Sequence, residues 1–439
     1  MTVKSAPSPC YNPEMLRRWY MVSGLLLAAC VTPTPASPEP TVVSPMAVGS
    51  TPAPIVTDTP HPPGKTLRLW MPPQFEPKPD TDSGAEFLNQ LKQFEQANAN
   101  TKIKVRVKRS SGAGGMIDSL LTGMSAAPDA LPDIIVINAR NLDAAAANGL
   151  IIELDELVTP DIKADYYKFA IESGSRNGII MSLPFATDAL VAAYATTAYK
   201  QSPTTWAAVL DSKYPVIFPA ADPQSIYAVQ QYLALGGTLQ ERSSVSVSIS
   251  TTALTQLLDH YVAARTAGVL NNSTLDFASG PETWSAYQEL RAPLVITNAH
   301  SYLQDASLAT NTAAGAPPTL RGKPYTLAES WFYALISKDM TRESGAWELV
   351  DWLLQPENMG TWALKAGYLP PRTKAIESWP DEAPIDFALE ILAAANERPD
   401  DDTLALIGPP LGKAVRNIIR GHVNTSAAVQ DVIQEISTE

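Results

Sequence analysis

The run at residues 132–137 constrains the fold more than any other stretch of the chain. It has the sequence PDIIVI, and such a run of β-branched residues is typical of a strand covered on both faces. Asn138 and Arg140 follow it, and the spacing of apolar residues then predicts a helix over 142–148. Strand and helix alternating in this way predict a parallel or mixed sheet with helices on both sides, which places the chain in the α/β class.

The same alternation continues in both directions. Further strands are expected at residues 65–70, 103–107, 178–181, 190–194, 216–218 and 293–297. Further helices are expected at residues 84–96, 116–125, 206–210, 226–235, 252–264, 284–290 and 344–354. The Ser- and Thr-rich residues 243–252 are interpreted as a loop or as a low-complexity turn into a helix, and the acidic residues 153–156 as the start of a helix.

Composition limits the classes of function. With 439 residues the chain is long enough for two domains with sizeable cores. The net charge of -13 argues against nucleic acid and anionic membrane surfaces as partners of the folded part. Both cysteines, Cys10 and Cys30, precede the first expected strand, and the 4 histidines are scattered. We therefore expect no disulfide framework, no metal cluster and no cofactor.

The N-terminal segment has the features of an export signal. Two arginines precede an apolar run at 19–29 that is too short to span a bilayer, so residues 1–29 are expected to be a signal peptide. The residues LAAC ending at Cys30 resemble a bacterial lipobox, which implies a diacylglycerol group on the Cys30 sulfur. The alternative is an ordinary signal peptide with a chance cysteine. Residues 30–64 are rich in Pro and Thr and are expected to form a disordered tether at the extracytoplasmic face of the cell membrane.

A second informative stretch lies at residues 178–200. Its first strand is expected to end at Pro184, because proline has no N–H to give to a ladder. Phe185 and Asp188 follow before the strand at 190–194, an arrangement that would suit a hinge crossing beside a ligand. The alternative is a buried Pro–Phe corner with a capping aspartate.

Residues at other strand ends are further candidates for a binding site. Ligands of α/β sheets lie outside the carboxyl ends of the strands. This rule selects Trp70, Asn138 and Arg140, and it adds Asn298 after the strand at 293–297. The alternatives for the first three are a core tryptophan, a helix cap and a surface arginine.

Catalytic patterns are missing from the sequence. It contains no GxSxG, HExxH, CxxC or Walker pattern, and nothing points to the facing carboxylates that a glycosidase needs, so we do not expect an enzyme. Binding a sugar requires less: aromatic rings stack on its C–H faces, while Asp, Asn and Arg take its hydroxyls. Trp70, Phe185 with Asp188, and Trp331 fit that pattern, although aromatic residues are equally common in cores.

Three stretches carry a resemblance to a known family. They are GIIMSLPFATDALVAAYATTAYK (178–200), PDIIVINARNLDAAAANGLIIELDEL (132–157) and AWELVDWLLQPENMGTWALKAGYLPPRTKA (346–375). They resemble extracellular solute-binding proteins of family 1, the sugar-type receptors of ABC importers. The chain departs from the family near Asn298, where a glycine and a tryptophan are missing, and at residues 329–331, where Glu-Ser-Trp replaces glycines.

The resemblance implies a two-lobed α/β fold of the periplasmic-binding-protein type (type II), with a hinge and an interlobe cleft. Lobe 1 would hold residues 65–190 and 331–365, and lobe 2 residues 191–330 and 366–439. The protein would be a monomer that captures a sugar or oligosaccharide and delivers it to the transmembrane subunits of an ABC permease. Two other classes stay open: an anchored carbohydrate-active hydrolase, and a sensory or adhesive surface module.

Overall fold

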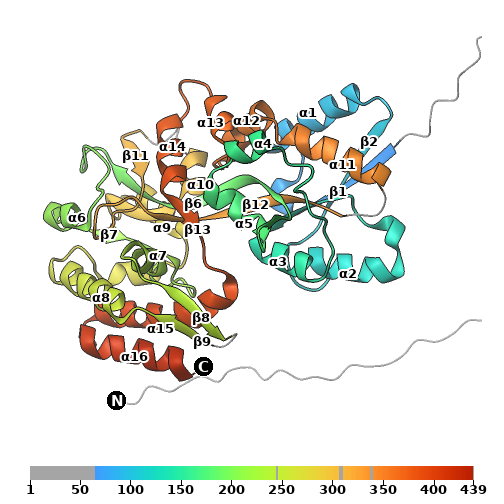
Figure 1. The fold of residues 1–439 in the computed structure, drawn as a ribbon. Coiled ribbons are helices and arrows are strands. Elements are labelled where there is room, and N and C mark those ends of the chain that lie inside the picture. The colour runs from blue at the N-terminus through green and yellow to red at the C-terminus, as the bar shows by residue number, and fades with distance from the viewer. Residues whose placement is uncertain (1–64, 244–245, 306–309, 337–339, 439) are drawn as a thin grey trace, which may run out of the picture. The chain divides into compact units, whose positions relative to one another are not determined.

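Strands from distant parts of the chain join in one mixed sheet (Figure 1). The computed structural model describes residues 65–243, 246–305, 310–336 and 340–438, so the predicted signal peptide, Cys30 and the tether lie outside the described residues. Among the residues described, nine strands form this sheet in the order β2-β1-β3-β12-β6-β10-β7, with β11 beside β6 and β13 beside β12. Their bounds are Thr101–Val107 (β2), Lys65–Met71 (β1), Ile134–Asn138 (β3), Thr326–Leu335 (β12), Leu183–Ala195 (β6), Leu294–Asn298 (β10), Val216–Ile217 (β7), Thr312–Gly315 (β11) and Ala395–Glu397 (β13).

Helices cover both faces of the half of the sheet that contains β1, β2 and β3 (Figure 1). One face is covered by α1 (Asp82–Ala97), α11 (Met340–Leu353) and α12 (Pro356–Ala366). The other face is covered by α2 (Met116–Ala126) and α3 (Ala139–Ala147). Alternate residues of β3 pack in the two layers: Ile134 and Val136 on one side, Ile135 and Ile137 on the other. The predicted strand covered on both faces is therefore confirmed. We call these two layers the first core.

The half of the sheet that contains β7, β10 and β11 is covered in the same way. One face is covered by α6 (Trp206–Ser212), α7 (Ile226–Ala234), α8 (Thr251–Thr266), α15 (Asp401–Arg420) and α16 (Thr425–Thr438). The other face is covered by α9 (Gly280–Gln288), α10 (Ala299–Asp305) and α14 (Ile385–Ala394). On β10, Leu294 and Ile296 face the first group, while Val295 faces the second. We call these two layers the second core.

The remaining elements are short. They are α4 (Pro160–Asp165), α5 (Lys168–Ser173), α13 (Thr373–Glu377), the 3-10 turns Pro73–Phe75, Pro128–Ala130 and Asn272–Asp276, and the strand pairs β4 (Ser175–Arg176) with β5 (Ile179–Ile180) and β8 (Leu239–Ser243) with β9 (Ser246–Ile249). Within the described part of the chain, no helix has both the length and the apolar character that a membrane crossing requires.

Strand β6 belongs to both halves of the sheet. Its residues 183–189 pair with β12, and its residues 190–194 pair with β10, both antiparallel. Along β6, Ala186 still packs in the first core, whereas Ala189 packs in the second. The strand therefore changes cores within three residues.

Four polar residues fill the place where the cores change. On β12 this place lies between Ala328, which packs in the second core, and Trp331, which packs against the first. The register sets Thr187 opposite Ser330 and Asp188 opposite Glu329. Since residues opposite each other in antiparallel strands point to the same face, the two pairs lie on opposite faces of the sheet. We call these four residues the junction.

The prediction that Pro184 ends a strand is wrong. The strand expected before it is reduced to β5, at Ile179–Ile180, and Pro184 lies inside β6. The pairing with β12 shifts between Trp331 and Phe332, which leaves Phe185 without an opposite residue. A proline is tolerated at such a bulge because the hydrogen-bond ladder is already interrupted there.

Two further local predictions are wrong. The segment at 243–252 is not a plain loop, because β8 and β9 form an antiparallel hairpin there. Its alternating Ser and Val residues have the period of a strand, and Val247 is buried in the second core. Residues 153–156 do not begin a helix. The carboxylate of Asp155 instead accepts the N–H of Ile180, at 2.8 Å, so it holds β5 in place.

Candidate functional site

Two cavities meet at the crossing strands. The first has a volume of about 350 Å³ and lies between the start of α3 and the segment 397–402. The second has a volume of about 270 Å³ and lies between the segment before α7, the segment before α9 and the end of β10. Three residues line both cavities: Ala328, Glu329 and Arg398. We call the two cavities together the cleft.

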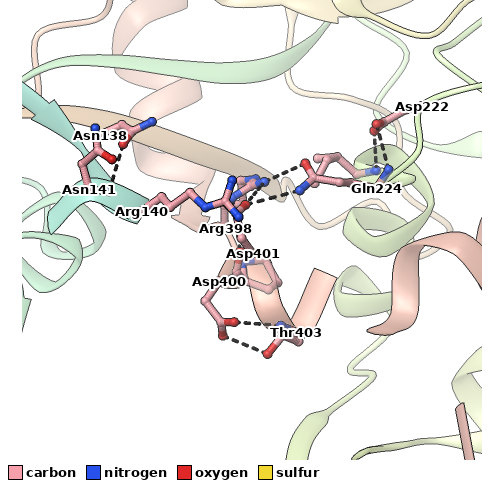
Figure 2. A network of polar contacts seen from close by, with 11 residues as sticks. Asn138, Arg140, Asn141, Asp222, Gln224, Arg398, Asp400, Asp401 and Thr403 are labelled. Carbon is pink, nitrogen blue, oxygen red and sulfur yellow. Dashed lines mark hydrogen bonds and ion pairs between the residues drawn. The ribbon is translucent and has the colours of Figure 1, made fainter. Parts of the chain in front are cut away.

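A network of charged and polar side chains crosses the cleft (Figure 2). Arg140 at the start of α3 forms an ion pair with Asp401 at the start of α15, with 3.2 Å between Nε and Oδ2. Arg398 donates from Nη2 to Asp401 Oδ1 at 2.8 Å and to the side-chain oxygen of Gln224 at 2.7 Å. Burial raises the pKa of Asp401, but the hydrogen bond and the charge of Arg398, with smaller contributions from Gln224 and Arg140, outweigh it and hold the pKa below its usual value. Asp401 therefore stays ionised and ties three segments together.

Helix starts fix the segments that carry these side chains. Asp400 caps α15 by accepting the N–H of Thr403 at 2.7 Å. Asp222 accepts the N–H groups of Gln224 and Ile226, at 3.0 and 2.8 Å, and so shapes the entry to α7. In each case a short acidic side chain satisfies donors that a helix start leaves free.

The junction contributes a second set of groups to the cleft. Asp188 Oδ1 accepts the N–H of His300 at 3.0 Å and that of Ala189 at 2.9 Å. Burial raises the pKa of Asp188, although these N–H groups and the side chain of Asn298 partly oppose the shift. Burial likewise raises the pKa of Glu329, and the nearby charge of Arg398 opposes it. On the other face of the sheet, Thr187 and Ser330 satisfy each other through a hydrogen bond of 2.8 Å.

Three of the residues predicted from the sequence line the cleft: Arg140, Asp188 and Asn298. Asn138 lines neither cavity; it accepts the N–H of Asn141 at 3.1 Å, so it serves as the cap of α3, which was its alternative interpretation (Figure 2). The structure thus brings together three polar candidates that are separated by up to about 160 positions in the sequence.

The three predicted aromatic residues do not line either cavity. Trp70 is 5% exposed and packs in the first core, with the cations of Arg106 and Lys108 over its ring. Phe185 is 4% exposed and stacks on Tyr333 with 4.4 Å between ring centroids. Both rings therefore pack in the core, which is the alternative interpretation that the sequence left open for them.

Trp331 is half-buried and packs edge-on against Phe75, at 5.1 Å between centroids, away from the cleft. Of the aromatic residues in the described part of the chain, Tyr227 alone lines the cleft. Polar and charged groups therefore dominate its walls.

Sequence reasoning missed Gln224, Arg398 and Asp401. Arg398 follows the three-residue strand β13, which is too short for a periodic signal, and Gln224 precedes α7 without a motif. A signal for Asp401 was present, since the run of three aspartates at 400–402 is typical of a helix start. Within the described residues, no three or more His, Cys, Asp or Glu side chains are placed so that together they could hold a metal ion.

Two larger cavities lie away from the junction. A cavity of about 1010 Å³ lies between residues 73–83, the end of α10 and the end of α12, and one of about 580 Å³ lies beside α9 and the segment 310–312. Neither contains a junction residue or any residue that the sequence predicted. Ligands of open α/β sheets lie where strand order changes, which is the place of the cleft.

Fold and site together define a class: a binding protein whose polar cleft lies where two strands cross between two α/β cores. A model of the bacterial extracellular solute-binding protein family matches residues 89–387, so the chain belongs to this family and the resemblance noted in the sequence is confirmed. No curated protein matches the chain.

Solved structures support the fold. The cyclic alpha-maltosyl-1,6-maltose binding protein from Arthrobacter globiformis is 16% identical, with a TM-score of 0.67 over 85% of this chain and 98% of that chain. The sugar-binding protein MalE from the phytopathogen Xanthomonas citri is 17% identical, with a TM-score of 0.66 over 85% and 97%. Maltose-bound MalE3 from T. maritima is 14% identical, with a TM-score of 0.63 over 85% and 100%. The chain therefore has the predicted type II periplasmic-binding-protein fold, and its family is one of binding proteins.

Proposed function

We propose that this protein is the receptor of an ABC importer, which captures a sugar or oligosaccharide in the cleft and delivers it to the permease. Lobe 1 would hold residues 65–190 and 331–365, and lobe 2 residues 191–330 and 366–439. Ligand contacts to both lobes would shift the population toward a closed form. Diacylglycerol on Cys30 and the tether would keep the protein, as a monomer, at the extracytoplasmic face of the cell membrane.

One observation carries the proposal: the walls of the cleft come from both sides of the junction. Arg140 stands on α3 over the first core, whereas Gln224 and Asp401 stand at helix starts of the second. A ligand between them would contact both cores at once. The guanidinium, carboxylate and amide groups present there are those that bind hydroxyls.

The ligand class rests on the relatives. The proteins from Arthrobacter globiformis and Xanthomonas citri bind sugars according to their descriptions, and another matched structure is a cyclo/maltodextrin-binding protein complexed with maltotetraose. These likenesses support a saccharide as ligand. The scarcity of aromatic rings in the cleft favours recognition through hydroxyls and charged groups rather than through stacking.

Thermal-shift and calorimetric titrations with a panel of saccharides test the proposal. A bound saccharide must raise the melting temperature, because it binds the folded state only, and small-angle scattering should show compaction on binding. Asp188→Asn should weaken binding about ten-fold or more, since it removes a charged hydrogen-bond acceptor. Asp386→Asn, on the exposed start of α14 outside both cavities, is the matched control. If no saccharide binds or if Asp188→Asn is neutral, the proposal is wrong.

A further inference from the structure

The charges in the cleft do not balance. Eight carboxylates line the two cavities: Asp143, Asp188, Asp222, Glu329, Glu397, Asp400, Asp401 and Asp402. Three cations line them: Arg140, Arg176 and Arg398. The cleft therefore has five more acidic than basic side chains. Because both cavities are small, the excess carboxylates lie close to any ligand that binds there.

All three arginines are already paired. Arg176 forms an ion pair with Asp143, while Arg140 and Arg398 share Asp401. Each positive charge in the described walls of the cleft is therefore already offset by a carboxylate. A ligand with a net negative charge would meet unpaired carboxylates instead, and like charges repel strongly in a site of low dielectric.

The carboxylate of Glu329 has no direct partner. Among the described residues it forms neither a hydrogen bond nor an ion pair, and it is the one carboxylate that lines both cavities. Arg398 is nearby, but its guanidinium donates to Asp401 and Gln224.

The register places a second carboxylate directly opposite. Asp188 on β6 faces Glu329 on β12, and side chains opposite each other in antiparallel strands have Cβ atoms about 5 Å apart. Like charges in that position are destabilising. The raised pKa of each carboxyl reflects burial first, and the neighbouring charge of Asp188 adds to the shift of Glu329. The register thus places two carboxyl groups side by side, and a cation between them would relieve their repulsion.

We infer that the saccharide bound in this cleft carries a protonated amine, which sits between Glu329 and Asp188. The inference rests on the proposed function and narrows its ligand class. An ammonium group has three donors and no acceptor, so it can reach both carboxylates and still donate to a third acceptor. A neutral hydroxyl cannot offset the two charges, and an anionic sugar would add a third.

Matched pairs of probes test the inference on the purified full chain at pH 7. The members of each pair differ only in amines that replace hydroxyls: one amine for glucosamine with glucose and for galactosamine with galactose, and two for the β-1,4-linked glucosamine disaccharide with cellobiose. In at least one pair the amine should bind about ten-fold to a hundred-fold more tightly, because a hydrogen bond to a charged partner is stronger than a neutral one. Calorimetry and the shift in melting temperature measure this preference.

Glu329→Gln separates the role of the charge from the shape of the site. This variant should remove most of the preference for the amine and leave the affinity for the neutral partner within about three-fold. It should also melt slightly higher than the wild type without ligand at pH 7, since the repulsion is gone. Glu289→Gln, on an exposed residue at the end of α9 outside both cavities, should change neither measurement.

Each outcome decides between the proposals. Neutral saccharides that bind as tightly as their amines would overturn the inference and leave the proposed function intact. If neither amines nor neutral saccharides bind, both fail. A rise in melting temperature with Ca²⁺ that Glu329→Gln abolishes would show that the pair holds a metal ion, which overturns the inference as well. An amine preference that Glu329→Gln does not reduce would refute the assigned residues.

Discussion

The ion pair between Asp165 and Arg372 gives the sharpest test of how this fold is held together. Arg372 Nε donates to Asp165 Oδ2 at 2.7 Å, and the two side chains are 8% (Arg372) and 4% (Asp165) exposed. Arg372 also donates to the carbonyl of Leu354, and Asp165 Oδ1 accepts the N–H of Lys374 at 3.0 Å. The pair therefore joins the end of α4 to the segment before α12 and to the start of α13.

We expect Asp165→Asn to destabilise the protein by about 3–5 kcal/mol. Removal of one partner leaves the guanidinium of Arg372 buried without a counter-charge, and this cost is typical of broken buried pairs. With an unfolding entropy of about 2.1 cal/mol/K per residue over ~370 residues, the melting temperature should fall by about 4–6 °C. Calorimetry of the purified variant measures this shift.

Two further variants make the reasoning refutable. The pair Lys168–Glu172 has the same charges, but its side chains are 86% and 57% exposed, so Glu172→Gln should lower the melting temperature by less than about 1 °C. The double variant Asp165→Leu with Arg372→Met should recover most of the loss, because apolar side chains can replace a buried pair at little cost. If Asp165→Asn melts within 1 °C of the wild type, the buried pair does not stabilise the fold as argued.

Three other perturbations have defined outcomes. Burial lowers the pKa of His260 to about 4, so between about pH 6.5 and 4 the unfolded chain binds a proton that the folded protein does not. As the pH falls through that range, the free energy of unfolding of the wild type should drop by about 3 kcal/mol more than that of His260→Phe. Melting profiles of the two proteins that stay parallel with pH would contradict this. A Cβ at Gly280 would lie 1.6 Å from Asn298 Oδ1, so Gly280→Ala should cost about 1–3 kcal/mol in calorimetry and should weaken ligand binding in titration. Ser279→Ala beside it, whose side chain caps nothing, should leave the stability unchanged in calorimetry, and an equal loss of stability in both variants would contradict the clash as the cause. Pro184→Ala, at the bulge in β6, should change the free energy of unfolding by less than about 1 kcal/mol. Ala186→Pro, two residues further on and in register with Trp331, should lower the free energy of unfolding by about 3 kcal/mol or more in urea. Equal effects would refute the bulge as the reason that the proline is tolerated.

The periodic parts of the fold could be predicted from the sequence, since burial imposes them locally. The run at 132–137 has apolar residues at consecutive positions, and the structure buries both faces of β3. Pro184 was interpreted by its missing N–H alone, because the bulge that accommodates it depends on β12, about 150 residues away. Strand ends are set by such partners, and a single stretch of sequence does not contain them.

The polar half of the candidate site was easier to predict than the aromatic half. Arg140 and Asn298 follow buried strands directly, and their position at the carboxyl ends places them at the cleft. Trp70 also stands near a strand end, but β1 continues to Met71 and the N–H of Lys108 bonds to the carbonyl of Met71, so Trp70 is still inside the sheet. If a strand ends one residue earlier or later, the side chain near its end moves to the other face of the sheet or out of the core. Composition does not reveal at which residue the strand ends.

The junction explains why a charged pair can stand in the middle of a nine-stranded sheet. A sheet buried on both faces has no room for carboxylates, and each core here is apolar on both sides of its strands. Between the cores, however, β6 and β12 pass through residues that neither core covers, and on the side of the cleft these are Asp188 and Glu329. Two carboxylates can therefore be carried on the most central strands, at the cost of their partial burial and of their mutual repulsion. Because both strands enter both cores, a ligand that relieves this repulsion would act on the connection between the two halves of the sheet as well as on its own binding site.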